Sequence, residues 1–135
     1  MSDKMTVREC MQRDVRIISR KYTVAAAARE LTRQRVSSFL VEPLDQNDTY
    51  GIITRKDVVE TLISDYSDEN VLLVEDVMTH PVISIGPDLS VQLAQQTMRM
   101  VGVRRLPVIE DGRLVGILSN SDILAALVPT GDSSC

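Results

Sequence analysis

The chain contains an internal repeat, and this feature limits its possible folds more than any other. An offset of 67 residues aligns Met11 with Met78 and then matches apolar positions without a gap: Val15 with Val82, Ile18 with Ile85, Val24 with Val91, Ala27 with Ala94, Val36 with Val103, and Val41 with Val108. After a loop that is two residues longer in the first copy, residues 51–57 (GIITRKD) fall on 116–122 (GILSNSD). Two long copies predict two similar units packed together rather than an open solenoid.

Both copies show the same order of expected elements. Short β-branched runs at 15–18 and 82–85 predict a first strand, which the turn at 86–88 closes in the second copy. Amphipathic helices are then expected to begin after Thr23 and Ser90, which are good N-cap residues. Their apolar stripes are Val24, Ala27, Ala28 and Leu31 in the first copy, and Val91, Ala94, Met98 and Val101 in the second. Strands at 39–41 and 106–109 follow, and a turn at 110–112 predicts a hairpin.

A last strand in each copy ends at Thr54 or Ser119, where a final helix begins. The resulting β-α-β-β-α unit has a small sheet, and alone it would bury too little apolar surface to offset chain entropy. We therefore expect an α/β (α+β) fold in which two such repeats pack through their sheets. The expected boundaries are 6–65 for repeat 1, 66–75 for an acidic connector, 76–128 for repeat 2, and 129–135 for a flexible tail.

Composition excludes several classes of protein. The chain is 44% hydrophobic and 25% charged, and no apolar run approaches the roughly 18 residues that span a bilayer. The charged start at 1–4 does not resemble an export signal. With only Cys10, Cys135 and a single histidine, His80, neither a disulfide framework, a metal site nor a His-based catalytic arrangement is expected. We expect a cytoplasmic protein without a membrane segment.

The net charge of −4 is unevenly distributed. Basic residues gather in the first third of the chain: Arg8, Arg13, Arg16, Arg20, Lys21, Arg29, Arg33 and Arg35. Few aromatic residues accompany them, which disfavours nucleic-acid binding and favours a solvated or anion-attracting face.

The motif that carries chemistry is Gly-apolar-apolar-Thr/Ser-x-x-Asp at each predicted strand-to-helix junction. Thr54 and Ser119 stand at N-cap positions, where backbone N–H groups and a hydroxyl can bind a phosphate. Asp57 and Asp122, one turn later, can accept hydrogen bonds from two ribose hydroxyls. The same spacing is also a capping box, which spacing alone favours. The two interpretations are compatible, because a helix end that caps itself when empty can exchange partners with a ligand.

These residues resemble a pair of CBS (cystathionine-β-synthase) domains, or Bateman module, from about Thr6 to Val128. The second copy resembles the family closely at 76–79 (DVMT), 102–108 (GVRRLPV) and 116–123 (GILSNSDI). The first copy is looser at 10–12 (CMQ) and 37–41 (SSFLV). The resemblance implies a stand-alone, flat, pseudo-two-fold module with two clefts between the repeats, each able to hold AMP, ADP, ATP or a related adenosyl ligand.

In such modules apolar strand residues surround adenine, the motif Asp binds ribose, and the hydroxyl and nearby basic side chains bind phosphate. Carried over to this chain, the ligand-binding residues are Ser119, Asp122, Arg104, Arg105, Val82, Thr79, Pro107, Thr54, Asp57 and Val15. Solvated charges at an exposed strand end are an equally open interpretation of Arg104 and Arg105.

Ser37 and Ser38 align with these two arginines, so charge-assisted phosphate contacts would be missing from the first copy. We expect the two sites to differ in affinity, unless Arg16, Arg20 or Lys21 compensates.

Three function classes follow from these observations. A regulatory module that senses adenine nucleotides is favoured, and a structural dimerisation module with empty clefts is the alternative. An enzyme is disfavoured, because no nucleophile with an adjacent base, phosphate loop or metal triad appears. No cofactor is expected to be required. We expect a homodimer formed through apolar helix residues such as 58–59 and 123–124, with a separate effector protein as the partner.

Overall fold

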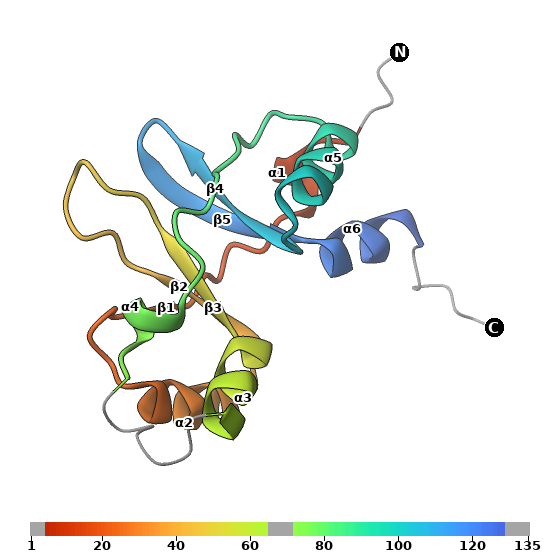
Figure 1. Cartoon of the computed structure of the whole chain (residues 1–135). Coiled ribbons are helices and arrows are strands. Elements are labelled where there is room, and N and C mark those ends of the chain that lie inside the picture. The colour runs from red at the N-terminus through yellow and green to blue at the C-terminus, as the bar shows by residue number, and fades with distance from the viewer. Residues whose placement is uncertain (1–4, 65–71, 129–135) are drawn as a thin grey trace. The chain divides into compact units, whose positions relative to one another are not determined.

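The structure is a computed structural model that describes residues 5–64 and 72–128 (Figure 1). Its elements are α1 (Val7–Cys10), β1 (Ile17–Ile18), α2 (Val24–Gln34), β2 (Ser38–Val41), β3 (Gly51–Thr54), α3 (Arg55–Ser64), α4 (Val74–Val77), α5 (Val91–Val101), β4 (Arg105–Glu110), β5 (Arg113–Ser119) and α6 (Asn120–Leu127). Most of the expected connector and all of the expected tail, with Cys135, lie outside the described residues. No helix within the described ranges is long and apolar enough to cross a membrane.

The chain forms two compact units, and one of them is discontinuous in sequence. Among the described residues, the repeat-1 unit is 15–64 with 72–82, and the repeat-2 unit combines 5–14 with 83–128. Helix α1 stands at the start of repeat 1 in the sequence but belongs to the repeat-2 unit, and helix α4 stands at the start of repeat 2 but belongs to the repeat-1 unit. Each unit is therefore completed by a segment from the start of the other repeat.

A three-stranded sheet forms the centre of the repeat-1 unit. Strand β1 pairs in parallel with β2, and β2 pairs antiparallel with β3 in a register that sets Ser38 opposite Thr54. Helices α2 and α3 contribute apolar side chains to one core with this sheet and α4: Ile18, Val24, Ala27, Leu31, Phe39, Val41, Ile53, Val58 and Val74. The amphipathic stripe predicted for residues 24–31 is thus confirmed as the buried face of α2.

The repeat-2 unit is built on the predicted hairpin of β4 and β5. Asp111 (φ 52°) and Gly112 (φ 77°) both have positive φ at the turn, as the tight hairpin type requires. The strand predicted at 82–85 is wrong, because only Ile85 pairs, through one parallel bridge to Val108. In repeat 1 the Leu40 N–H donates to the Arg16 carbonyl at 3.0 Å. The equivalent of Leu40 is Pro107, which has no N–H to donate, so the ladder cannot extend.

The long helices begin and end at equivalent residues in the two repeats. Thr23 and Ser90 accept hydrogen bonds from the backbone N–H three residues later, which confirms them as N-caps. At the other end, Arg35 (φ 58°) and Gly102 (φ 82°) both adopt the left-handed conformation that ends a helix. Val101 was predicted on the buried stripe, but it is 39% exposed because burial on α5 ends at Met98.

The motif glycines allow the exchanged segments to approach the last strand of each unit. Ile117 and Gln12 exchange two backbone hydrogen bonds of 2.9 Å, and Ile52 and Thr79 do the same. A Cβ at Gly116 would lie 2.7 Å from the Met11 sulfur and 2.8 Å from the Gln12 carbonyl oxygen. At Gly51 it would lie 2.7 Å from the Met78 sulfur and 3.1 Å from the Thr79 oxygen. Glycine is therefore required at both positions by close backbone approach rather than by φ.

We predict that Gly116→Ala lowers the free energy of unfolding by about 2 kcal/mol, because the added methyl group forces the Gln12 backbone away from β5. Gly51→Ala acts in the same direction, and urea denaturation measures both changes. Gly86→Ala is the control, since a Cβ there meets nothing within 4 Å. Equal stability of the Gly86 and Gly116 variants would contradict the close approach.

Candidate functional site

Both strand-to-helix junctions form the capping box that their spacing predicts. Ser119 Oγ accepts from the Asp122 N–H at 3.1 Å, and Asp122 Oδ2 accepts from the Ser119 N–H and Oγ–H, both at 2.9 Å. In repeat 1, Thr54 Oγ1 accepts from the Asp57 N–H at 3.2 Å, and Asp57 Oδ2 accepts from the Thr54 N–H at 2.8 Å. The hydroxyl and the carboxylate therefore meet at the start of α3 and of α6.

Strand pairing places Arg105 beside the second junction. The register of the hairpin sets Arg105 directly opposite Ser119, and the Arg104 carbonyl accepts from the Asn120 N–H at 3.1 Å. Burial lowers the pKa of Arg105, the neighbouring Arg104 lowers it further, and the Asp122 carboxylate opposes both. A partly buried guanidinium thus lies close to the predicted sugar-binding carboxylate. In repeat 1 the uncharged Ser38 occupies the position opposite Thr54.

Gln12 belongs to this junction and was not predicted as a site residue. Its Nε2 donates to Asp122 Oδ1 at 3.0 Å, so both carboxylate oxygens of Asp122 accept hydrogen bonds. The backbone pairing of Gln12 with Ile117 brings it there. The sequence could have indicated Gln12, because the 67-residue offset aligns it with Thr79, which was predicted as a site residue.

The structure divides the ten predicted site residues equally between the two units. Ser119, Asp122, Arg104, Arg105 and Pro107 lie in the repeat-2 unit, and Thr54, Asp57, Val15, Thr79 and Val82 lie in the repeat-1 unit. Pro107 and Val82 are buried, Val15 is half-buried, and Thr79 and Arg104 are exposed. Val82 donates its N–H to the Tyr50 carbonyl at 3.0 Å, and Pro107 accepts from the Ile85 N–H at 3.0 Å.

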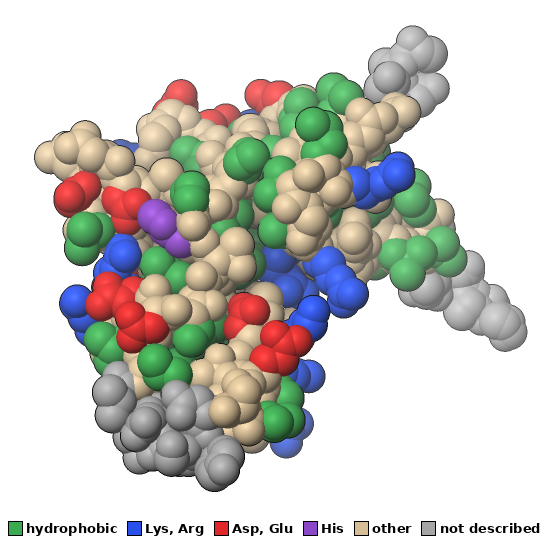
Figure 2. Space-filling model, viewed as in Figure 1, with side chains coloured by type: hydrophobic (Ala, Val, Ile, Leu, Met, Phe, Trp, Pro, Cys, Tyr) green, Lys and Arg blue, Asp and Glu red, His purple; other side chains and the backbone are tan. Residues whose placement is uncertain are grey.

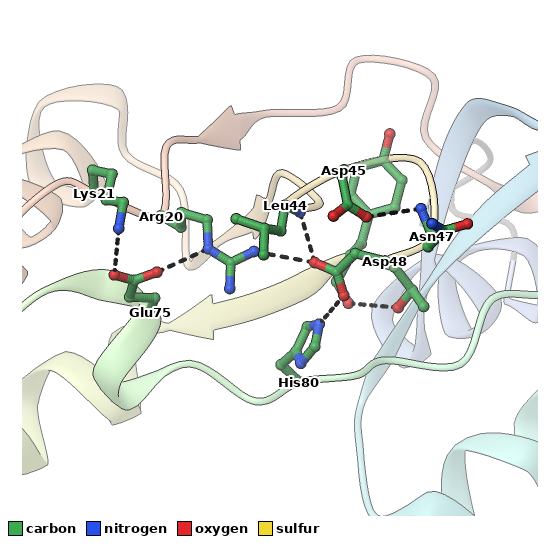
Figure 3. A network of polar contacts seen from close by, with 10 residues as sticks. Arg20, Lys21, Leu44, Asp45, Asn47, Asp48, Glu75 and His80 are labelled. Atoms are coloured by element: carbon green, nitrogen blue, oxygen red, sulfur yellow. Dashed lines mark hydrogen bonds and ion pairs between the residues drawn. The ribbon is translucent and has the colours of Figure 1, made fainter.

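The basic residues considered as substitutes for Arg104 and Arg105 have partners elsewhere. Arg20 is only 13% exposed, and it bonds Glu75 at 2.9 Å and Asp48 at 3.1 Å (Figure 3). Lys21 pairs with Glu75 at 2.9 Å, and Arg16 donates to the Gln34 side chain at 2.7 Å. Binding a phosphate with Arg20 or Lys21 would therefore require an ion pair to break.

Asp48 is the centre of this second polar cluster. Its carboxylate accepts from the Leu44 N–H at 2.6 Å and from Arg20, and it lies 2.7 Å from His80 Nε2 (Figure 3). The Leu44 amide contributes most to holding the pKa of Asp48 far below its usual value, followed by His80, the Thr49 amide and Arg20, against an opposing effect of burial. The cluster ties the loop between β2 and β3 to the segment after α4. Figure 2 shows the histidine at the surface beside acidic side chains.

Neither a metal cluster nor a disulfide is found among the described residues. No group of three or more His, Cys, Asp or Glu side chains in these ranges could hold a metal ion. Cys10 is a free, buried thiol. The polar groups at the two junctions include hydroxyls, carboxylates, the Gln12 amide and the Arg105 guanidinium, which suit a ligand with hydroxyl and phosphate groups.

The CBS domain family model matches residues 7–64 and 74–129 of the chain. The chain therefore belongs to the CBS-domain family, with one domain in each repeat. The resemblance seen in the sequence and the α/β fold of two repeats are both confirmed.

The chain is similar to known proteins over most of its length. An uncharacterized protein, MK0525, of Methanopyrus kandleri is 31% identical, over 89% of this chain and 61% of its own length. The hexameric CBS-CP12 protein from bloom-forming cyanobacteria is 29% identical, with a TM-score of 0.83, over 96% of this chain and 78% of that one. The CBS domain pair of protein MJ0100, solved with 5′-methylthioadenosine and S-adenosyl-L-methionine, is 23% identical, with a TM-score of 0.75. The match covers 92% of this chain and 96% of that one, and it shows that the two share a fold. The chain spans 61%, 42% and 22% of the first three curated relatives.

We predict that Asp48→Asn lowers stability at neutral pH and weakens its dependence on pH. The folded-state pKa of Asp48 is depressed, so its contribution is present above the unfolded-state pKa of about 3.9 and is lost as pH falls below it. Urea denaturation at pH 7 and at about pH 3 measures the difference. Asp45→Asn is the control, because Asp45 Oδ1 accepts only a local turn bond from the Asn47 N–H. An Asp48→Asn chain with the pH profile of the unmutated protein would contradict the cluster's role.

Proposed function

We propose that the chain is a regulatory module that binds AMP, ADP, ATP or a related adenosyl ligand at its strand-to-helix junctions. The observation that carries this proposal is the reciprocal capping box that holds a hydroxyl residue and a carboxylate residue at the start of both α3 and α6, with Arg105 opposite Ser119 in the second unit. Binding would change the conformation of the module, and a separate effector protein would respond. The proposal includes no catalytic step and places the protein in the cytoplasm.

The empty junction satisfies its own polar groups, and a ligand would replace some of these bonds. Phosphate oxygens would accept from the N–H groups at the start of α6, where the helix dipole favours negative charge, and from the Ser119 hydroxyl. The Asp122 carboxylate would exchange the Ser119 hydroxyl and the Gln12 amide for two ribose hydroxyls. Each exchange replaces one hydrogen bond with another, so the change itself has a small free energy.

The two junctions are proposed to differ in ligand preference. Arg105 gives the Ser119–Asp122 junction a positive charge that the Thr54–Asp57 junction lacks at the equivalent Ser38. A charge-assisted bond to phosphate is stronger than a neutral one. Phosphorylated ligands should therefore bind more tightly at the Ser119–Asp122 junction than at the Thr54–Asp57 junction. Adenosyl compounds without a phosphate should show a smaller difference in affinity between the two junctions. The complex of the MJ0100 domain pair with two adenosyl compounds supports this ligand class.

Self-association without a ligand is the second candidate function. Val59 and Ile63 of α3 and Leu124 and Leu127 of α6 are 47%, 71%, 62% and 61% exposed, more than a monomer needs to leave uncovered on two short helices. The expectation that Val58 and Ile123 lie on these exposed faces was wrong, since both are buried in their own units. We propose a homodimer through the outward residues, and the hexameric CBS-CP12 protein shows that family members assemble.

We predict that AMP, ADP or ATP at about 100 times its dissociation constant raises the free energy of unfolding by about 2.7 kcal/mol, and that Asp122→Asn weakens binding about 10–100-fold by removing a charged acceptor. Calorimetric titration with the three nucleotides, adenosine and S-adenosylmethionine measures affinity at each site, and Asp57→Asn tests the first site.

Asp76→Asn is the matched control, because Asp76 also caps a helix, through the Leu73 N–H at 2.9 Å, but the helix that it caps is α4 rather than α3 or α6. It should leave every affinity unchanged. If no adenosyl compound binds at millimolar concentration, the sensing function is wrong and the structural one remains. If the Asp57→Asn, Asp122→Asn double variant binds normally, the ligand does not bind at these two junctions.

A further inference from the structure

Helices α1 and α4 are equivalent in the repeat but carry opposite charges. The 67-residue offset aligns Val7–Cys10 with Val74–Val77, and both first valines are fully buried. Both helices are capped in the same way, by Glu9 at 2.8 Å and by Asp76 at 2.9 Å from the amide of the preceding cap residue. At the second position of the helix, however, Arg8 aligns with Glu75.

The surfaces that receive these helices have the matching opposite charges. In the repeat-2 unit, Arg8 Nη2 lies 2.7 Å from Glu110 Oε2 and 3.2 Å from Asp88 Oδ1. In the repeat-1 unit, Glu75 lies 2.9 Å from both Arg20 Nε and Lys21 Nζ. Lys21 and Asp88 are themselves equivalent under the repeat offset. The Glu75–Lys21 pair is thus the charge-reversed counterpart of the Arg8–Asp88 pair.

Apolar packing alone distinguishes the two docking surfaces poorly. Val7 and Val74 fill equivalent buried positions, and Met11 and Met78 approach the equivalent glycines, Gly116 and Gly51. The charged residues of the two surfaces, however, are opposite in sign: Arg20 and Lys21 on repeat 1, and Asp88 and Glu110 on repeat 2. Placed on repeat 1, helix α1 would bring its arginine to Arg20 and Lys21, and α4 on repeat 2 would bring its glutamate to Asp88 and Glu110. Like charges at such separations are repulsive in both wrong combinations.

The charges on the repeat-1 surface are better shielded from water than those on the repeat-2 surface, where Arg8, Glu110 and Asp88 are 38%, 36% and 84% exposed. Arg20 is 13% exposed and Glu75 is 23% exposed, so their attraction is less screened than that of a fully exposed pair. Lys21 and Arg20 hold the pKa of Glu75 below its usual value, and Arg8 does the same to Glu110.

We propose that Arg8 and Glu75 are specificity determinants that assign each short helix to the unit of the other repeat. Each charge attracts the helix to its observed surface and repels it from the equivalent surface of its own repeat, which is specificity by both attraction and exclusion. This role requires no ligand and goes beyond the proposed sensing function. It explains why a duplicated sequence reverses the charge of one ion pair while keeping its apolar positions.

Disulfide trapping in the full-length chain tests the assignment. The Cα pairing of Thr6 with Ser90, and of Thr23 with Leu73, marks the observed docking. With Cys10 and Cys135 replaced by Ala, the pair Thr6→Cys, Ser90→Cys reports the observed arrangement and the pair Thr6→Cys, Thr23→Cys reports the alternative. With native charges we expect the first pair to cross-link and the second to remain reduced.

In the Arg8→Glu, Glu75→Arg background we expect the ratio of 6–90 to 6–23 cross-links to fall by about tenfold, measured by mass spectrometry of peptides after equilibration in a thiol redox buffer. Reversal of the exposed Glu30–Arg33 pair within α2 is the matched control and should leave the ratio unchanged. An unchanged ratio in the charge-swapped chain would overturn the proposal.

A rescue variant covers loss of folding. If Arg8→Glu reduces 6–90 cross-linking or the melting temperature, then adding Asp88→Lys and Glu110→Lys should restore both, because the attraction is rebuilt with inverted signs. Failure of this restoration would show that Arg8 acts through something other than charge and would also overturn the proposal.

Discussion

The structure depends on backbone pairing between a short segment at the start of one repeat and the last strand of the other repeat. Gln12 pairs with Ile117, and Thr79 pairs with Ile52, at places where only a glycine lets the two backbones come so close. This pairing completes each unit. It places Val7 and Met11 against the core of the repeat-2 unit, and Val74 and Met78 against the core of the repeat-1 unit. The same glycine begins the motif that ends in the site's hydroxyl and carboxylate. Fold and candidate site therefore share one constraint.

In the proposed binding mode, the ligand would contact the same atoms that cap the helices at these junctions. Ser119 and Asp122 close the first turn of α6 through reciprocal bonds, so the helix start is stable without a ligand. The strand opposite adds Arg105, and the exchanged segment adds Gln12, so residues from three parts of the chain meet at one helix end. Such a site can be preorganised and still have bonds available for exchange, which a reversible sensor requires.

Much of the fold could be predicted because the repeat tests each element twice. Helix starts at Thr23 and Ser90, the 110–112 turn and the capped junctions follow from local chemistry, and the structure confirms them. The prediction of a strand at 82–85 failed because Pro107, at least 22 positions away, has no N–H to donate to this segment. A local sequence pattern cannot show the effect of so distant a residue. The exchange of α1 and α4 is a tertiary choice between two similar surfaces. Its signal was the sign reversal between Arg8 and Glu75, which an alignment of apolar positions does not consider.

Native-state amide hydrogen exchange shows whether segment 5–14 folds as part of the repeat-2 unit. We expect the Gln12 amide, bonded to the Ile117 carbonyl, to be protected to the same free energy of opening as the amides of β5. The Thr79 amide should likewise share the protection of β3. A Gln12 amide that exchanges at the rate of an unstructured peptide while β5 stays protected would contradict the exchanged architecture.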